Sequence, residues 1–175
     1  EAVTSAGRNN EMAYQVAKAA KELKRDMETA LLSNVAKSAG SATAARKLGG
    51  CPTWYETNVD AGAGGSGAGN GAVRTDGTQR AFTEDQLKGI LVSCYNEGGN
   101  PNMIMVNAFN KQKLSGFTGG STRFDAAEDR RLITSIDVYE SDFGTMQVAP
   151  NRFIRNNNAA AAKKGQDAYV LEMDM

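Results

Sequence analysis

Apolar residues recur at three- and four-residue steps from Ala13 to Leu31. This spacing predicts an amphipathic helix from about Glu11 to Leu32, ~30 Å long at about 1.5 Å per residue. Most of its apolar stripe is alanine, and small side chains allow close packing on a sheet or on another helix. The opposite face is charged, which predicts solvent or a subunit contact there: Lys18, Lys21, Lys24, Arg25 and Glu28.

Between residues 36 and 81 the apolar residues no longer recur at a regular spacing. The run AGAGGSGAGNGA at 61–72 has too few apolar side chains to fix a conformation, so it predicts a mobile loop. Gly62–Gly67 also fits GxGxxG, but a dinucleotide site needs a strand before that motif and a helix directly after it. Neither pattern is present. Trp54 and Tyr55 stand alone in this region, and we expect them to hold the loop to the core.

Periodic order returns at the stretch Thr83–Gln86, which reads as a capping box and predicts the start of a helix. The apolar face of that helix would be formed by Leu87, Ile90, Leu91 and Cys94, and Gly98 would end it. The continuous apolar run MIMVN at 103–107 then predicts a strand buried on both faces. A short helix is expected in AFNKQKLS at 108–115, ended by a glycine.

Alternating patterns predict strands at 132–141 and 144–150, followed by an extended piece, FIR, at 153–155. A last strand is expected at 168–173. The shared apolar face of the first two strands would carry Leu132, Ile136, Val138, Met146 and Val148. The order is helix, long loop, helix, strand, short helix and three or four strands. This order predicts an α+β fold with one extended excursion.

The link between the first two of these strands spells Asp142-Phe143-Gly144, the letters of the magnesium motif of protein kinases. A kinase also needs a glycine-rich loop on strands, a strand lysine and a catalytic Asp with a downstream Asn, and this set is missing. Ser141 and Asp142 can instead hydrogen-bond their own backbone, and Gly144 can take a positive φ. The motif therefore predicts a β-hairpin turn with Phe143 as its packing anchor. A fully buried ring there would cost ~3–5 kcal/mol on truncation to alanine.

Length, apolar content and net charge limit the classes of function that this chain can have. The 175 residues suit one domain, and 41% of them are apolar, enough for a core. Twenty basic and twenty acidic residues cancel, so there is no general attraction to nucleic acid or anionic lipid. No apolar run approaches the ~20 residues that span a bilayer, so no membrane is expected as a partner. Both ends look cut, because the chain opens in polar sequence and closes directly after a strand.

The chain has no histidine, which excludes Ser-His-Asp and Cys-His catalysis and most zinc sites. Cys51 and Cys94 are expected to be free thiols, although a disulfide between them remains open. Paired carboxylates could serve acid–base chemistry or bind a hard cation, and two pairs exist, Glu128 with Asp129 and Asp137 with Glu140. The first pair lies beside two arginines and the second on a polar strand face, where surface charge is commoner. No catalytic, cofactor or metal site is therefore predicted, and a metal-dependent enzyme is the weakest alternative.

Three stretches together resemble the major capsid proteins of tailed bacteriophages: TEDQLKGILVSCYNEGGNPNMIMVNAFNKQKLSGF, ITSIDVYESDFGTMQVAPNRF and AYVLEMDM. The match covers about Phe82 to Met175, and the helix at Glu11–Leu32 resembles the spine helix of that family. The resemblance implies the capsid fold shared by tailed phages and herpesviruses. The family's N-terminal arm and extended loop are missing here, so the chain is interpreted as a truncated core. Its parts would be a spine helix of the peripheral domain (1–35), a glycine-rich insert (36–81), an axial-domain-like helix–strand–helix region (82–135), and a hairpin with strands that return to the peripheral domain (136–175).

The same resemblance implies the function. The chain would be a phage or prophage capsid subunit that self-assembles through hexamers and pentamers into an icosahedral shell around DNA. Assembly would take place in the bacterial host cytoplasm, with scaffolding or decoration proteins and non-specific DNA contacts as further partners. Arg152 is expected in an intersubunit or hairpin-anchoring contact, and the candidate hairpin and interface residues are Asp142, Phe143, Gly144, Asn151 and Arg152. The alternative is another virion structural or attachment module that does not form a closed shell, which assembly state would distinguish.

Overall fold

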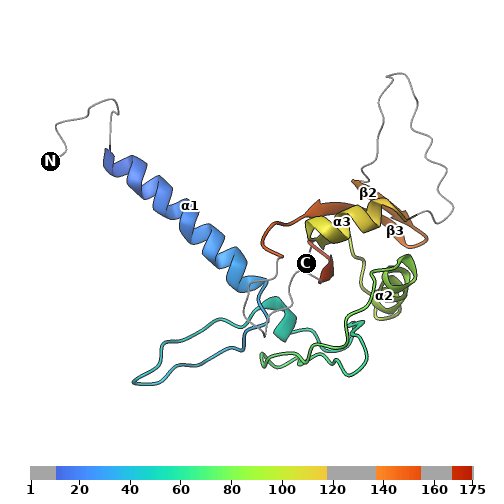
Figure 1. The fold of residues 1–175 in the computed structure, drawn as a ribbon, viewed down its shortest axis with the longest axis horizontal. Coiled ribbons are helices and arrows are strands. Elements are labelled where there is room, and N and C mark those ends of the chain that lie inside the picture. Colours follow the sequence, from blue (N-terminus) through green and yellow to red (C-terminus); the bar gives the residue numbers. More distant parts are fainter. Residues whose placement is uncertain (1–10, 118–136, 155–166, 175) are drawn as a thin grey trace, which may run out of the picture.

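The structure is a computed structural model that describes residues 11–117, 137–154 and 167–174. The described residues form three α-helices and four strands, and Figure 1 shows their arrangement. Their order agrees with the predicted α+β arrangement. The elements are α1 (Glu11–Leu31), a short 3-10 turn (Cys51–Thr53), α2 (Glu84–Asn96), β1 (Met103–Val106), α3 (Ala108–Ser115), β2 (Val138–Ser141), β3 (Gly144–Pro150) and β4 (Ala168–Leu171).

The four strands form one sheet in the order β2-β3-β1-β4. The strand β1 pairs in parallel with β3 and antiparallel with β4, while β2 and β3 form an antiparallel hairpin. The first strand in the sequence is therefore central in the sheet, and its two partners come from later, separate segments. The strands β2 and β4 are the two edges.

One face of the sheet carries the main core. Ile104 on β1 lies beside Val148 on β3 and Val170 on β4, so these residues point to the same side. Side chains from α2 and α3 close that side, which confirms the apolar face predicted for the helix after Thr83. The buried cluster contains Leu87, Leu91, Ile104, Val106, Leu114, Met146 and Val148.

The other face of the sheet carries a smaller cluster at the end of α1. Leu32, Ile154 and Tyr169 are buried there, and Met105 packs against them. In β1, Ile104 and Val106 are fully buried, whereas the methionines on the second face are only partly covered. The prediction that this strand is buried on both faces is therefore only half right, because the second face has a small cover.

Local signals at the ends of α2 act as predicted. The Thr83 hydroxyl accepts a hydrogen bond from the Gln86 N–H (3.4 Å), and the Gln86 side chain accepts one from the Thr83 N–H (3.2 Å). Past the C-terminal end of the helix, Gly98 has a φ of +83°, a conformation that glycine adopts without steric cost.

Two predictions about the hairpin region are wrong. Val138 is 60% exposed, because the register pairs it with Gln147 and pairs Tyr139 with the buried Met146. The FIR piece is not extended: the chain turns after Asn151, whose side-chain oxygen accepts the Phe153 N–H (2.8 Å). Leu132, Ile136 and Arg155 lie outside the described residues.

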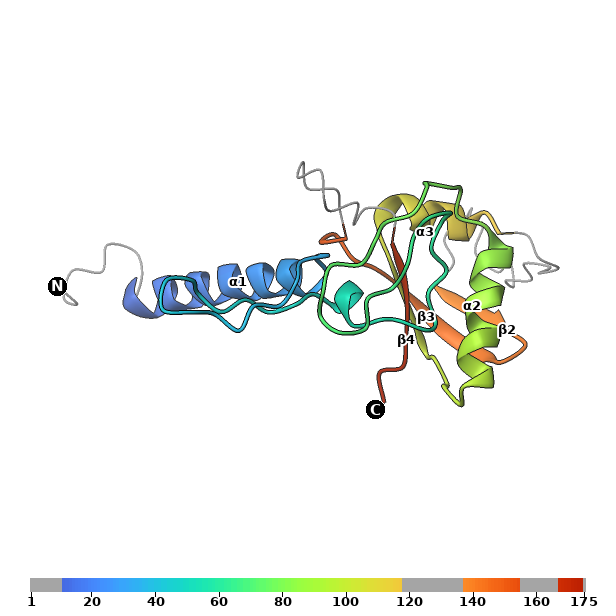
Figure 2. The same ribbon diagram turned by 90° about the horizontal axis from the view of Figure 1, so that it is seen from below.

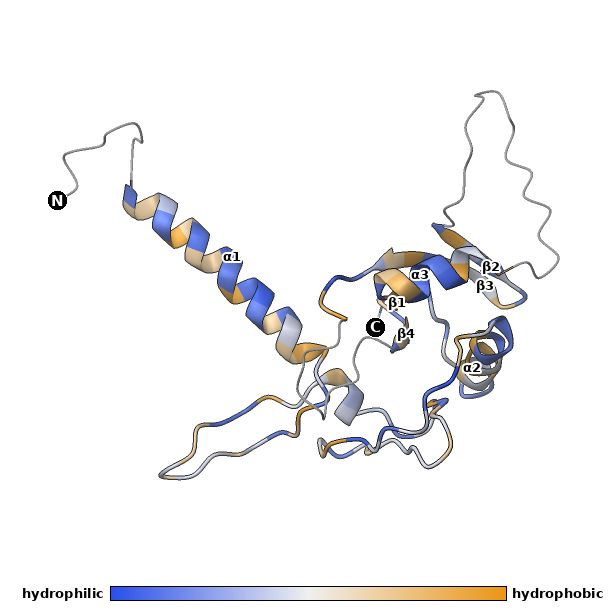
Figure 3. Cartoon of the chain, viewed as in Figure 1, coloured by the Kyte–Doolittle hydropathy of each residue, from blue (hydrophilic) through white to orange (hydrophobic). Residues whose placement is uncertain are grey.

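The helix α1 extends away from the sheet, as Figures 1 and 2 show from two directions. None of its residues is buried. The close packing expected from its alanine stripe is therefore not made within the described chain. Figure 3 shows apolar and polar residues interspersed along this exposed helix.

The glycine-rich stretch, predicted to be a mobile loop, forms a hydrogen-bonded double layer of backbone. The Thr78 N–H donates to the Ala63 carbonyl (3.0 Å), and Ser66 and Thr75 exchange two backbone hydrogen bonds (3.0 and 3.1 Å). A Cβ on Gly62 would overlap the backbone of Thr78. Glycine lets the two chain segments come into backbone contact, and these backbone contacts hold a stretch that has few apolar side chains to bury. No strand or helix flanks Gly62–Gly67 in this described stretch, so the dinucleotide interpretation fails.

Candidate functional site

The hairpin turn between β2 and β3 has the predicted geometry. Asp142 and Phe143 form a two-residue link between Ser141 and Gly144. The Ser141 hydroxyl accepts the Phe143 N–H (3.3 Å) and donates to the Gly144 carbonyl (3.0 Å). Gly144 has a φ of +137°, which favours glycine. The letters Asp-Phe-Gly thus form a turn, as predicted.

Phe143 packs less deeply than expected. Its ring lies on Tyr95 of α2, with 4.8 Å between the ring centroids, but the residue remains 37% exposed. The ring therefore attaches the hairpin tip to α2 at the surface instead of filling the core.

We expect Phe143→Ala to lower the free energy of unfolding by about 1 kcal/mol, because a partly exposed aromatic pair is lost instead of a core ring. Urea unfolding measures the change. The double variant with Tyr95→Ala should show a coupling between the two rings. A loss as large as that of a buried phenylalanine would contradict this surface role.

Asn151 connects three elements at the place where the end of α1 meets the sheet. Its side-chain amide donates to the Glu28 carboxylate (2.7 Å) and contacts the Met105 sulfur (3.3 Å). Its backbone N–H donates to the Val106 carbonyl (2.8 Å). We call Glu28, Leu32, Asn151 and Ile154 the helix–sheet junction. Asn151 therefore sets where α1 leaves the sheet, a role that sequence reasoning assigned in part to its neighbour.

Arg152 points into a different environment. It is exposed and lines a groove with Lys24, Arg25 and Glu28. It has no ion pair with a described residue, so the anchoring contact of this segment belongs to Asn151. An intersubunit role for Arg152 stays a prediction.

Asn151→Ala should lower the free energy of unfolding by about 1.5–3 kcal/mol, because the hydrogen bond to the charged Glu28 is lost. Thermal or urea unfolding checks this value. Arg152→Ala, an adjacent exposed position, should change it by less than about 0.5 kcal/mol. Equal losses in the two variants would show that Asn151 is not the anchor.

A partly buried charge network ties the glycine-rich region to Tyr169 in the cluster at the end of α1. The Arg74 guanidinium bridges Asp76 (3.0 Å) and Asp167 (2.7 Å), and the Tyr169 hydroxyl donates to Asp167 (3.1 Å). Burial lowers the pKa of Arg74, but the two carboxylates outweigh it and leave that pKa raised. Burial raises the pKa of Asp167 more than Arg74 lowers it. Sequence reasoning missed this network, since its members are separated by 93 positions.

Asn34, just after α1, exchanges two hydrogen bonds with the Arg74 backbone (both 3.0 Å). The network faces a cavity of about 430 Å³ between residues 55–80, α2 and β4. On its rim Tyr55 lies 6.3 Å from Tyr169, centroid to centroid, as expected of a residue that holds the loop. Trp54 is exposed instead and lies under the Lys37 ammonium at 4.8 Å.

Burial and the nearby Cys51 raise the pKa of Tyr55 to about 12. The folded state therefore keeps a proton that the unfolded chain loses near pH 10, so stability falls as pH rises from 10 to 12. Thermal unfolding across this range should show a steeper decline for the wild type than for Tyr55→Phe. Parallel profiles would show that this phenol does not contribute.

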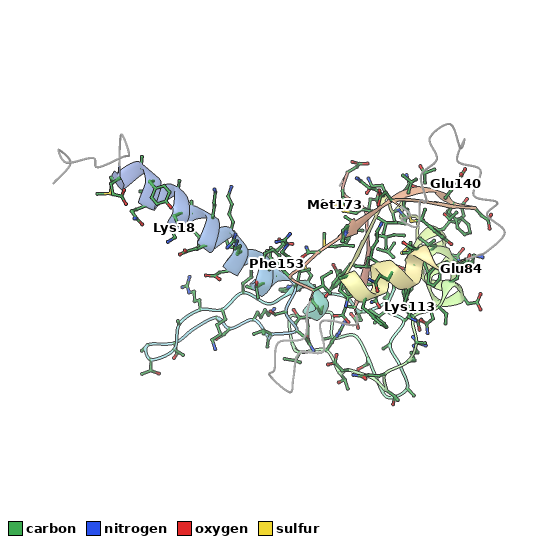
Figure 4. All side chains as sticks on the ribbon, turned by 45° about the horizontal axis from the view of Figure 1, so that its top comes forward. Lys18, Glu84, Lys113, Glu140, Phe153 and Met173 are labelled. Atoms are coloured by element: carbon green, nitrogen blue, oxygen red, sulfur yellow. The ribbon has the colours of Figure 1, made fainter. Side chains whose placement is uncertain are left out.

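The proposed carboxylate pairs do not form a common site. Asp137 is paired with Lys111 (3.1 Å), Glu140 is exposed (Figure 4), and Glu128 and Asp129 lie outside the described residues. Among the residues that the structure describes, no group of three or more acidic or thiol side chains could hold a metal ion. Cys51 and Cys94 are free thiols. No helix in the described ranges is long and apolar enough to cross a membrane.

The described chain thus combines a helix with no buried residue, a hairpin within a small sheet and a hydrogen-bonded glycine-rich layer. The model of the SU10 major capsid protein family matches residues 1–173, and the chain belongs to that family. It is thus a structural capsid subunit of a bacteriophage virion that associates with itself in a shell. Comparison with curated proteins gave no significant match.

Proposed function

We propose that this subunit self-assembles, through rings of five and six copies, into a closed icosahedral head around DNA. The head would belong to a tailed phage or prophage and form in the host cytoplasm, with scaffolding or decoration proteins as further partners. In this proposal α1 is the spine helix, residues 82–135 lie toward the ring axis, and residues 136–175 return to the peripheral domain. DNA contacts would be non-specific, in keeping with the balanced charge.

The observation that carries this proposal is the exposure of α1. It has 21 residues and none is buried. Most helix stability in proteins comes from packing an amphipathic face. Leu23 is 62% exposed and Met27 56%, one turn apart on the same helix. The apolar side chains of Leu23 and Met27 are therefore largely uncovered in the single chain, and neighbouring copies in a shell would cover them.

Analytical ultracentrifugation of the full-length gene product, followed by negative-stain microscopy, tests the proposal. We expect closed shells, or discrete rings of five or six. A stable monomer or dimer under every assembly condition would contradict it and favour an attachment module.

The variant Leu23→Glu tests the helix itself. It should leave the circular dichroism melt unchanged while reducing assembly, because the side chain is exposed in the single chain. Val92→Glu, an exposed apolar position on α2, is the matched control. Normal assembly of Leu23→Glu would show that this part of α1 is not a contact surface.

A further inference from the structure

Residues 36–50 form a second projection, which we call the arm. Ser38 and Lys47 exchange two backbone hydrogen bonds (both 3.0 Å), and the Ser41 N–H donates to the Ala44 carbonyl (2.9 Å) across the tip. Figures 1 and 2 show the arm leaving the body on the same side as α1, away from β4. Its two halves are joined by one isolated bridge, and residues 41–48 are all exposed.

The base of the arm is firmly held. The Gly50 N–H donates to the Val35 carbonyl (3.2 Å), and the Lys37 N–H donates to the Gly71 carbonyl (2.9 Å). Thr53 is fully buried at the base, where its hydroxyl donates to the Gly50 carbonyl (2.7 Å). An arm fixed at its base loses less conformational entropy when it binds than a flexible loop does.

The arm is positively charged and partly apolar. No Asp or Glu occurs from Thr29 to Tyr55, while Lys37, Arg46 and Lys47 are present. Neither Arg46 nor Lys47 has an ion pair with a described residue, and the neighbouring Leu48 is 64% exposed. Such a surface fits an acidic, partly apolar partner.

The matching surface lies along β4, the strand that carries Tyr169 of the cluster at the end of α1. This strand pairs with β1 on one side only, and its outer edge carries no backbone hydrogen bond to a described residue. Asp167–Val170 line the cavity of about 430 Å³, which residues of the stretch 58–80 of the same chain also line. A strand edge that lacks a backbone partner is a template for adding a strand from another chain.

Carboxylates follow β4 in the sequence, and two of them accept hydrogen bonds from the residues that lead into β1. The Glu172 carboxylate accepts the Asn100 N–H (3.1 Å), and Asp174 accepts the Asn102 side-chain amide (2.7 Å). Glu97, at the end of α2, accepts the Asn58 side-chain amide (3.0 Å). No described cation pairs with these three groups, so they are held in place without being neutralised.

We propose that the arm of one subunit adds to the outer edge of β4 in the next copy, with Arg46 and Lys47 beside Glu172 and Asp174. The inference rests on the proposed self-assembly and names its contact. An arm that points away from its own β4 reaches this edge only in a neighbour. The contact joins two different surfaces, and such head-to-tail contacts generate rings when the rotation closes.

Charge reversal in the full-length protein tests this contact. Lys47→Glu and Asp174→Lys should each weaken assembly at least about tenfold by sedimentation, because each places like charges together. The double variant should assemble to within about twofold of the wild type, since the pair is restored with its signs exchanged. Lys113→Glu, an exposed reversal away from both surfaces, is the matched control and should assemble normally. Circular dichroism melts confirm that each variant is folded.

The outcomes separate the two proposals. If the wild type does not assemble, both fail. If it assembles and Lys47→Glu assembles equally well, or the double variant stays as defective as the single ones, only the arm contact fails. Normal shells of Lys47→Glu with a reduced DNA content would also overturn it, because the arm would then bind nucleic acid instead of a neighbour.

Discussion

Leu91→Ala should lower the free energy of unfolding by about 2–5 kcal/mol, the largest loss that we expect from a core truncation here. Leu91 lies on the inner face of α2, is 1% exposed and belongs to the main buried cluster. Truncation of the Leu91 side chain leaves a cavity next to β1. Because β1 is paired with a strand on each side, its residues have little freedom to move into that cavity.

The control for this prediction is the next residue in the same helix. Val92 is 42% exposed, and Val92→Ala should change stability by less than about 0.5 kcal/mol. Urea unfolding of both variants gives the comparison. Similar values for the two positions would mean that α2 does not pack on the sheet with the face described.

Gly50→Ala should cost about 3 kcal/mol or more, because a single methyl group would enter occupied backbone space. Its Cβ would overlap the Ser33 carbonyl group and would also lie 3.1 Å from the Ala30 carbonyl oxygen. The φ of Gly50 is −73°, which suits any residue, so space alone requires glycine. The same substitution should displace the base of the arm from the end of α1.

Gly89→Ala is the matched control, with the opposite sign. This glycine lies inside α2, and a Cβ there would meet no atom within 4 Å. Alanine should raise stability by about 1 kcal/mol through helix propensity. Thermal unfolding of the two variants separates steric exclusion from a general effect of losing glycine. A small change in the stability of Gly50→Ala would show that the base of the arm can widen.

Local sequence signals predicted most of the elements. The capping box at Thr83, the run MIMV and the turn at Gly144 each depend on neighbours a few positions away, and each was found where expected. The family was also visible, because its residues are arranged along the chain in a recognisable order.

Relations between distant segments were not predictable in this way. The face of Val138 was misassigned because a shift of one position in strand register reverses every side chain. The place where α1 meets the sheet and the role of Asn151 depend on a hydrogen bond between Asn151 and Glu28, which are 123 positions apart. The glycine-rich stretch was misjudged because its contacts are between backbones, which composition does not report.

The order of the sheet has a consequence for how the molecule is made. The hairpin β2–β3 is local and can form as soon as it is synthesised, but β1 must wait for partners more than forty and sixty positions later. Distant pairing is slow, and a strand that waits is exposed meanwhile. The edge strand β4 is the last of these elements to leave the ribosome. If the arm docks on β4 as we propose, an arm emerging early in translation would find this site only on subunits that are already complete, and assembly would then follow folding.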